Sequence, residues 1–273
     1  LPSIVDGKVV EGFKNKQQTD ILTDRAIHFL RSNREQPFFL HFNPFVTHQG
    51  YWGTVPDEDL ARYQDKRLTV PQTFGVPEAK MDGDGVRRLM RIFYGAITCA
   101  DRNLGRLLAA IDDLHLTQNT IVLFLGDNGM NLGHVGLIGK GNASYLGSNP
   151  RLHRPNMFDR SVLVPFIVRW PGTVKPGATS DRLVSTIDIL PTLMHATGAS
   201  IGHGIQLDGK SLLPILKGEP VDWRASYCEA YNMTYHTEAH MRMIRTDRWK
   251  LVLHFDPKGR ALADGGRHEL YDL

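Results

Sequence analysis

The segment between Thr120 and Lys140 constrains the fold of this chain more than any other. An unbroken apolar run, residues 120–125, is bounded by turn residues, which is typical of a buried strand. Asp127-Asn128-Gly129 follows this run directly, and Lys140 lies a dozen residues further on. Hard divalent cations take oxygen ligands such as Asp and Asn, and a lysine close to such a cation suits a tetrahedral oxyanion. The segment therefore predicts a strand that ends in a cation-assisted site for a sulfate or phosphate ester.

Strand-like and helix-like patterns alternate over the rest of the chain. The predicted strands are residues 37–43, 120–125, 164–170, 241–245 and 250–254, and the predicted helices run from Thr19 or Thr23 to Leu30, from 85 to 114 and from 185 to 197. Residues 51–81 are rich in Pro, Gly and charge, and we expect an irregular excursion there. This order predicts an α/β fold, with a mostly parallel or mixed sheet sandwiched by helices over residues 1–220. A small antiparallel subdomain over residues 221–273 would complete it. In such sheets ligands gather at the carboxyl ends of strands, where Asp127-Asn128 and His48 both fall.

Composition excludes several classes of protein. The net charge of +3 is small and evenly spread, which argues against a nucleic-acid-binding protein. No apolar stretch approaches the length of a membrane span, and no targeting segment is visible. The two cysteines, Cys99 and Cys228, could form at most one disulfide and do not decide the redox compartment. Because the chain opens on Leu1-Pro2 and stops at Leu273, we expect it to be a segment of a longer protein.

An ordered series of short phrases resembles the sulfatases of the alkaline phosphatase superfamily. The phrases are Pro37-Phe-Phe-Leu-His-Phe with Thr47-His48, Tyr94-Gly-Ala-Ile, Leu104-Gly105-Arg106, Asp127-Asn128-Gly129, Gly133-His134 with Gly139-Lys140-Gly141, Val164-Pro-Phe-Ile, Trp170-Pro171-Gly172, Asp188-Ile-Leu-Pro191-Thr, Asp208-Gly209-Lys-Ser-Leu, Arg245-Thr-Asp-Arg-Trp-Lys250 and Glu269-Leu-Tyr-Asp. Each phrase alone is weak. Their consistent order over almost the whole chain makes the resemblance specific.

The resemblance implies a role for five residues. Asp127 and Asn128 are similar to the two later ligands of a Ca²⁺ site, where Mg²⁺ is the other candidate. Lys140 is similar to the lysine that binds the sulfate oxygens. His48 resembles the histidine that contacts the sulfate or protonates the leaving oxygen, and His134 a residue lining the mouth of the pocket. The implied activity is sulfate-ester hydrolysis, with a carbohydrate sulfate as the preferred substrate class and a periplasmic, secreted or lysosomal location.

The chain departs from the family pattern where the nucleophile should be. Sulfatases use a formylglycine made from Cys or Ser in a Cys-x-Pro/Ala-x-Arg phrase, together with an Asp-Asp pair near the mature N-terminus. Cys99-Ala-Asp-Arg102 has the wrong spacing, and Cys228-Glu-Ala-Tyr-Asn232 has Asn in place of Arg. Asp112-Asp113 lies at the polar end of a predicted helix and is expected to be a surface pair. We therefore expect the formylglycine in an upstream segment, and no turnover by this chain alone.

Simpler interpretations remain open for each candidate. Asp-Asn-Gly is also a common turn tripeptide, Lys140 between glycines could be a solvated loop lysine, and His48 and His134 could be structural histidines. In the long segment 142–156, His153 and Arg154 are expected to lie on the surface, although contact with substrate is the other possibility. Residues 231–240, with His236, Glu238 and His240, resemble a transition-metal cluster by composition, but a specificity loop or plain surface is favoured.

Two other functions remain open beside sulfate-ester hydrolysis. One is phosphonate or phosphodiester hydrolysis by the same superfamily, in which the same cation and lysine would act on phosphorus. The other is non-catalytic binding of a sulfated ligand. The identity of the nucleophile, formylglycine or a Ser or Thr hydroxyl, would discriminate among the three. No nucleic-acid partner is expected, and the sequence leaves the oligomeric state open.

Overall fold

The computed structural model describes residues 3–5, 8–10, 17–71, 77–148, 153–202, 204–233, 238–262 and 268–273. The chain forms two compact units. Unit 1 comprises Leu1–Gly75, Lys80–Thr120 and Leu132–Val135, and unit 2 comprises Val76–Ala79, Ile121–Asn131 and Gly136–Leu273. No helix in the described part is both long and apolar enough to cross a membrane.

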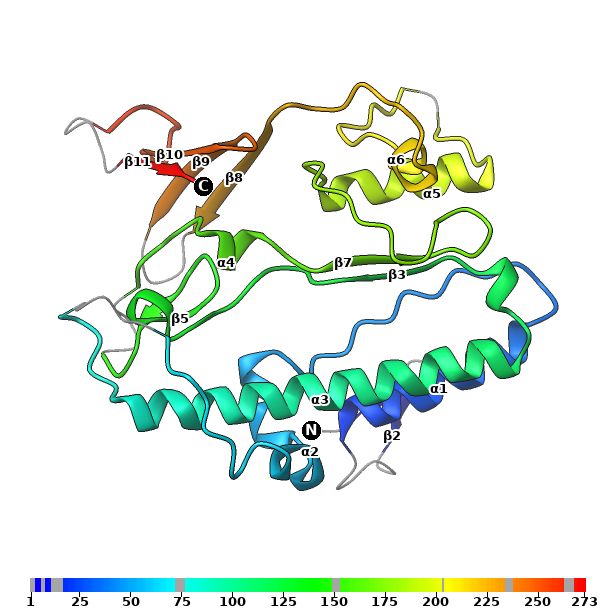
Figure 1. The fold of residues 1–273 in the computed structure, drawn as a ribbon, viewed down its shortest axis with the longest axis horizontal. Coiled ribbons are helices and arrows are strands. Elements are labelled where there is room, and N and C mark those ends of the chain that lie inside the picture. The colour runs from blue at the N-terminus through cyan, green and yellow to red at the C-terminus, as the bar shows by residue number, and fades with distance from the viewer. Residues whose placement is uncertain are drawn as a thin grey trace. The chain divides into compact units, whose positions relative to one another are not determined.

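Unit 1 is built on two helices that lie side by side (Figure 1). Its elements are the β1 (Ser3–Val5) and β2 (Lys8–Val10) hairpin, α1 (Gln18–Asn33), the 3-10 turn η1 (Gln49–Thr54), α2 (Asp57–Ala61), α3 (Gly83–Asp113) and the 3-10 turn η2 (Thr117–Asn119). Asp82 caps α3 by accepting a hydrogen bond from the Gly85 amide at 2.7 Å. The predicted long helix is thus present within two residues of its expected ends. Asp112-Asp113, at its last turn, is exposed, in agreement with the prediction.

A buried polar network fixes α3 against α1 and α2. The guanidinium of Arg102 donates to Asp20 and to the nearly inaccessible Asp59, both at 3.0 Å. Asn103, fully buried, donates to the same Asp20 at 2.8 Å. Because a buried charge is tolerated only when it is paired and hydrogen-bonded, this network specifies how the helices of unit 1 pack.

Two local predictions in unit 1 are wrong. α1 begins earlier than expected, because the side chain of Gln17 accepts from the Thr19 and Asp20 amides. Thr19 and Thr23 are therefore buried inside the helix instead of capping it. Residues 37–43 are extended but form no strand, and Phe39 is 75% exposed. Apolar runs become strands only where a neighbouring strand pairs with them, and no described strand does so here.

Unit 2 contains the strand that precedes the predicted site. Its elements are β3 (Val122–Leu125), β5 (Leu137–Gly139), β6 (Ser144–Tyr145), α4 (Asp159–Val162), β7 (Phe166–Arg169), the 3-10 turn η4 (Thr186–Asp188), α5 (Ile189–Thr197), α6 (Leu213–Lys217), β8 (Tyr227–Met233), β9 (Ala239–Arg245), β10 (Trp249–Phe255) and β11 (Glu269–Asp272). β4 (Asn131–Leu132) and the turn η3 (His134–Gly136) span the division between the units. β3 pairs antiparallel with β7, and β5 pairs antiparallel with β6.

The predicted C-terminal antiparallel sheet is confirmed. Its four strands run in the order β11-β10-β9-β8, and every neighbour is antiparallel (Figure 1). One face buries a cluster of Met157, Met241, Met243 and Val252. On that face the ammonium of the buried Lys250 donates to Asp159 of α4 at 2.6 Å, and Arg245 donates to the same carboxylate at 2.7 Å. These ion pairs attach the sheet to α4. The boundary at residue 220 remains a prediction.

Candidate functional site

The Asp127-Asn128 turn presents oxygen atoms directly after β3. Asp127 Oδ1 accepts from the Asn128 amide at 2.8 Å, and Asn128 Nδ2 donates to the Gly129 carbonyl at 3.0 Å. This hydrogen bond orients the amide and leaves the side-chain carbonyl oxygen of Asn128 as the atom that could bind a cation. The Asp127 carboxylate is exposed and has no ion pair with any described cation. These oxygens are of the type that Ca²⁺ and Mg²⁺ bind.

Gly129 closes this turn onto the backbone of α4. Its amide donates to the Ser161 carbonyl at 3.0 Å. A Cβ at this position would lie 1.9 Å from the carbonyl oxygen of Arg160, which is far inside van der Waals contact with a backbone atom. Only glycine therefore fits between the Asp127-Asn128 turn and α4.

We expect Gly129→Ala to lower the free energy of unfolding by about 1–3 kcal/mol, since a backbone atom must move to admit the methyl group. The measurement is urea denaturation followed by circular dichroism. Gly105→Ala is the matched control, because it lies within α3 with open space around it and should leave stability unchanged or raise it by about 0.5–1 kcal/mol. Equal stability of Gly129→Ala and the wild type would contradict the close approach.

Buried amides hold the backbone of Lys140 in place. The Lys140 carbonyl accepts from the Ala143 amide at 3.0 Å and from Asn156 Nδ2 at 3.2 Å. Asn131 Nδ2 donates to the Gly139 carbonyl at 3.1 Å and to Ser161 Oγ at 2.7 Å. Ser161 Oγ in turn donates to Asn156 Oδ1 at 2.7 Å. All three of these polar side chains are buried, so the loop that carries Lys140 is rigidly supported.

The side chain of Lys140 lines a pocket of about 220 Å³ that lies within unit 2. Asn128, Asn156 and Ser161 line the same pocket, and Glu229 and Tyr231 of β8 complete it. Within the described residues the Lys140 ammonium has no ion pair. A lysine cation without an ion pair among the described residues is suited to bind an anion.

Sequence reasoning missed Glu229, whereas Tyr231 begins the segment 231–240, for which a specificity loop or plain surface was expected. Burial alternates along β8, and residues 227, 229 and 231 share the face that packs on the Met157 cluster. This alternation is visible only in the structure, and no sequence signal identified Glu229. The Tyr231 ring lies against Gly141, where a Cβ would approach it to 2.9 Å. Burial raises the pKa of the Glu229 carboxyl, and the 3.2 Å hydrogen bond from Tyr227 opposes this.

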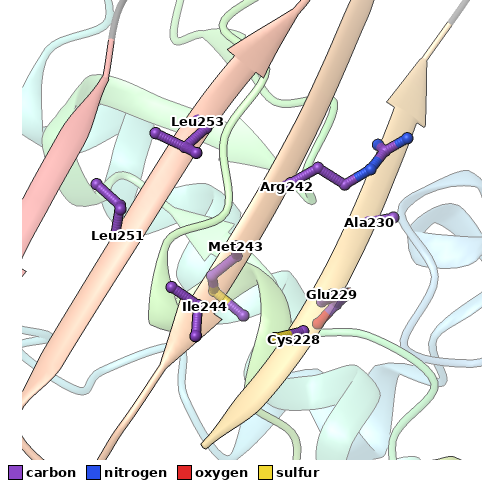
Figure 2. Close-up of a pocket in the computed structure, with 8 residues that line it drawn as sticks. All are labelled: Cys228, Glu229, Ala230, Arg242, Met243, Ile244, Leu251 and Leu253. Carbon is purple, nitrogen blue, oxygen red and sulfur yellow. The ribbon is translucent and has the colours of Figure 1, made fainter. Parts of the chain in front are cut away.

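The opposite face of the C-terminal sheet carries a second, apolar pocket of about 340 Å³. Figure 2 shows its lining residues on the strands, with Arg242, Leu251 and Leu253 standing on the near side. Cys228 is exposed and is a free thiol, as is the buried Cys99. Burial raises the pKa of the Cys99 thiol to about 11, and a protonated thiol is a poor nucleophile. Cys99 is therefore unsuited to act as the nucleophile of the site, and Cys228 does not line the pocket of Lys140.

The two histidine candidates belong to unit 1. His48 is exposed, and its amide donates to the Phe45 carbonyl at 2.8 Å in a turn. His134 is half-buried, beside Gly133 and Val135, which both have positive φ. Asn128 and Lys140 share the pocket of unit 2, with Asp127 next to Asn128 in the chain. The roles of all five residues remain predictions.

The other candidate segments engage neighbouring groups. His153 Nδ1 lies 2.7 Å from the Asn142 carbonyl, and the Arg154 guanidinium stacks 5.1 Å from the Phe158 ring centroid. His236 lies outside the described residues. His240 contacts Asn232 and Glu238. No group of three or more His, Cys, Asp or Glu residues that could hold a metal ion is present in the part of the chain that the structure describes.

Two protein-family models match this chain. The family model described as Sulfatase matches residues 3–199, and the model described as N-sulphoglucosamine sulphohydrolase, C-terminal, matches residues 152–273. The chain belongs to the sulfatase family.

Individual sulfatases show the same relationship over most of the chain. The steryl-sulfatase of Rattus norvegicus is 27% identical over 250 residues, which are 89% of this chain and 38% of that protein. The N-acetylglucosamine-6-O-sulfatase of Bacteroides thetaiotaomicron is 29% identical over 192 residues, 68% of this chain and 30% of that protein. The chain thus spans about a third of the length of these two curated sulfatases.

Solved structures confirm the sulfatase fold. A structure in complex with its substrate D-glucosamine-2-N,6-O-disulfate matches with a TM-score of 0.77 at 21% identity, over 98% of this chain and 65% of that one. The phosphonate monoester hydrolase of Agrobacterium radiobacter matches with a TM-score of 0.68 at 21% identity, over 100% of this chain and 57% of that one. Sulfatases and phosphonate hydrolases therefore share this architecture.

Proposed function

We propose that the protein hydrolyses sulfate esters and that Lys140 binds the sulfate oxygens. One observation carries this proposal: Lys140, whose ammonium has no ion pair with a described residue, lines the same pocket as Asn128. A fixed positive charge next to the ester stabilises the negative charge that builds up on its oxygens as the S–O bond breaks. Because buried amides hold the loop from its backbone side, the ammonium needs little reorganisation to do so.

Asp127 and Asn128 would hold a divalent cation, with Ca²⁺ as the first candidate and Mg²⁺ as the second. The donor set supports this, because one carboxylate and one amide oxygen are left available at the end of β3. The cation would neutralise the charge of the ester group when bound. Two adjacent residues do not fill the coordination sphere of Ca²⁺, which takes six to eight oxygens, so further ligands must come from elsewhere.

The remaining roles are proposed from the family. His48 would contact the sulfate or protonate the leaving oxygen, and His134 would contact the substrate. The formylglycine nucleophile would come from outside this chain, since neither Cys99 nor Cys228 stands in a matching phrase. For the same reason this chain by itself is expected to be inactive.

A sulfated carbohydrate is the proposed substrate, and a periplasmic, secreted or lysosomal compartment the proposed location. The first rests on the relatives named for N-acetylglucosamine-6-O-sulfate and for a disulfated glucosamine. Phosphonate or phosphodiester hydrolysis is the second candidate, supported by the shared fold of the Agrobacterium enzyme. A non-catalytic protein that binds sulfated ligands is the third.

The test is an assay of sulfate release by the full-length protein in which this chain occurs. Phenyl sulfate and the monoester phenyl methylphosphonate are offered separately, with Ca²⁺ and after chelation. Release of sulfate that requires the cation supports the proposal. Release of phenol from the phosphonate monoester alone would establish the second candidate, and binding of phenyl sulfate without cleavage of either compound the third.

A further inference from the structure

Lys140 and Glu229 line one pocket, and neither neutralises the other. The two side chains form no ion pair, and in the described chain neither has one elsewhere. Among the described residues, the one side-chain hydrogen bond to the Glu229 carboxylate comes from the neutral Tyr227 hydroxyl at 3.2 Å. The lining of this pocket of about 220 Å³ therefore contains both a cationic residue and a carboxyl residue.

Lys140 and Glu229 favour different parts of a bound ligand. The ammonium attracts the sulfate group, whereas the carboxylate repels it and favours a hydrogen-bond donor. Glu229 is half-buried, and burial raises the pKa of its carboxyl, so a donor from the ligand would replace hydration that the fold has removed. A sterol or a phenol offers no hydroxyl at such a position once its own oxygen is esterified. A sugar offers several.

We propose that Glu229 contacts the substrate, accepting a hydrogen bond from a hydroxyl group of the sugar while Lys140 binds its sulfate. This inference rests on the proposed sulfatase function. It makes Glu229 a specificity residue that favours a polyhydroxylated leaving group over an aromatic one.

The position of Glu229 in the sheet supports this role. On β8 it stands opposite Met243 of β9, and Tyr231 stands opposite Met241. Both methionines are buried in the cluster that also contains Met157, a pocket residue. The backbone of Glu229 is held by the ladder, and its side chain is held from one side by Tyr227. Its carboxyl group is thus oriented before any ligand arrives.

The test compares two esters that share the sulfate and differ in the leaving group, glucose 6-sulfate and phenyl sulfate. Glu229→Ala should lower kcat/KM for glucose 6-sulfate by about 10- to 100-fold, the usual effect of losing a hydrogen bond to a charged group. It should leave kcat/KM for phenyl sulfate within about twofold of the wild type. Glu229→Gln keeps an accepting oxygen but not the charge. Its kcat/KM for glucose 6-sulfate should therefore lie between those of the wild type and Glu229→Ala.

Glu269→Ala is the matched control. Glu269 lies on β11 of the same sheet and, like Glu229, accepts a hydrogen bond from a tyrosine two residues away, Tyr271. Glu269 does not line the pocket, so Glu269→Ala should leave kcat/KM for both esters unchanged. Equal losses on both esters for Glu229→Ala, or no loss on glucose 6-sulfate, would overturn the inference.

Binding measurements separate this inference from the proposed function. If the wild type releases no sulfate from either ester, the proposed function fails, and titration calorimetry with the same two esters still decides the role of Glu229. Weaker binding of glucose 6-sulfate alone by Glu229→Ala supports it. A wild type that binds neither ester overturns both.

Discussion

Lys140→Ala is expected to lower kcat/KM for phenyl sulfate hydrolysis by about 100- to 1000-fold in the full-length protein. This is the usual effect of removing one preorganised group that stabilises developing negative charge. Lys140 has no ion pair with a described residue, and its loop is held through its backbone carbonyl. Thermal stability should therefore remain close to that of the wild type, and the loss should appear in activity alone.

Two variants sharpen this experiment. Lys140→Arg keeps the charge but replaces a compact ammonium with a planar guanidinium, and partial activity is expected. Lys175→Ala removes an exposed lysine of the same unit and should leave kcat/KM for phenyl sulfate unchanged. Undiminished activity of Lys140→Ala would remove Lys140 from the site.

Asp188→Ala is expected to be the most destabilising single change, lowering the free energy of unfolding by about 3–5 kcal/mol. The Asp188 side chain is fully buried in η4. It accepts from the Ser185 and Lys210 amides, both at 2.8 Å, and from Arg224 at 2.5 Å. Its loss leaves a mostly buried guanidinium and two amides without their acceptor. Urea denaturation of the wild type and the variant measures the difference.

The controls for Asp188 distinguish a lost network from a lost charge. Asp188→Asn keeps an acceptor oxygen and should lower the free energy of unfolding by less than Asp188→Ala. Its stability can still be measured if the alanine variant does not fold. Asp272→Ala breaks an exposed pair with Arg248, and exposed pairs of this kind contribute little. A cost for Asp188→Ala no larger than that for Asp272→Ala would contradict the account.

Sequence alone was sufficient for features that depend on neighbouring residues. The apolar run before Asp127 predicted β3, and helical spacing predicted α3, because both patterns are local. The cap of α1 was misplaced because Gln17 is an unusual capping residue.

Contacts between segments far apart in the sequence could not be predicted from such local patterns. Glu229 reaches the pocket of Lys140 only because the C-terminal sheet packs on Met157 and α4. No spacing rule joins residue 140 to residue 229. Gly129 likewise looked like an ordinary turn glycine, and only the carbonyl of Arg160 shows why a methyl group cannot be admitted.

The position of β8 in the sheet has a consequence for how such a protein could diversify. β8 is the outermost strand of its sheet, paired through its backbone with β9 on one side and with no described strand on the other. The Glu229 side chain can be exchanged while the ladder persists, and the loop that carries Lys140 relies on other residues, Asn131 and Asn156, for support. Under the roles proposed above, recognition of the leaving group would then change by mutation independently of the chemistry at sulfur. A library randomised at position 229 alone would test this on an unchanged scaffold.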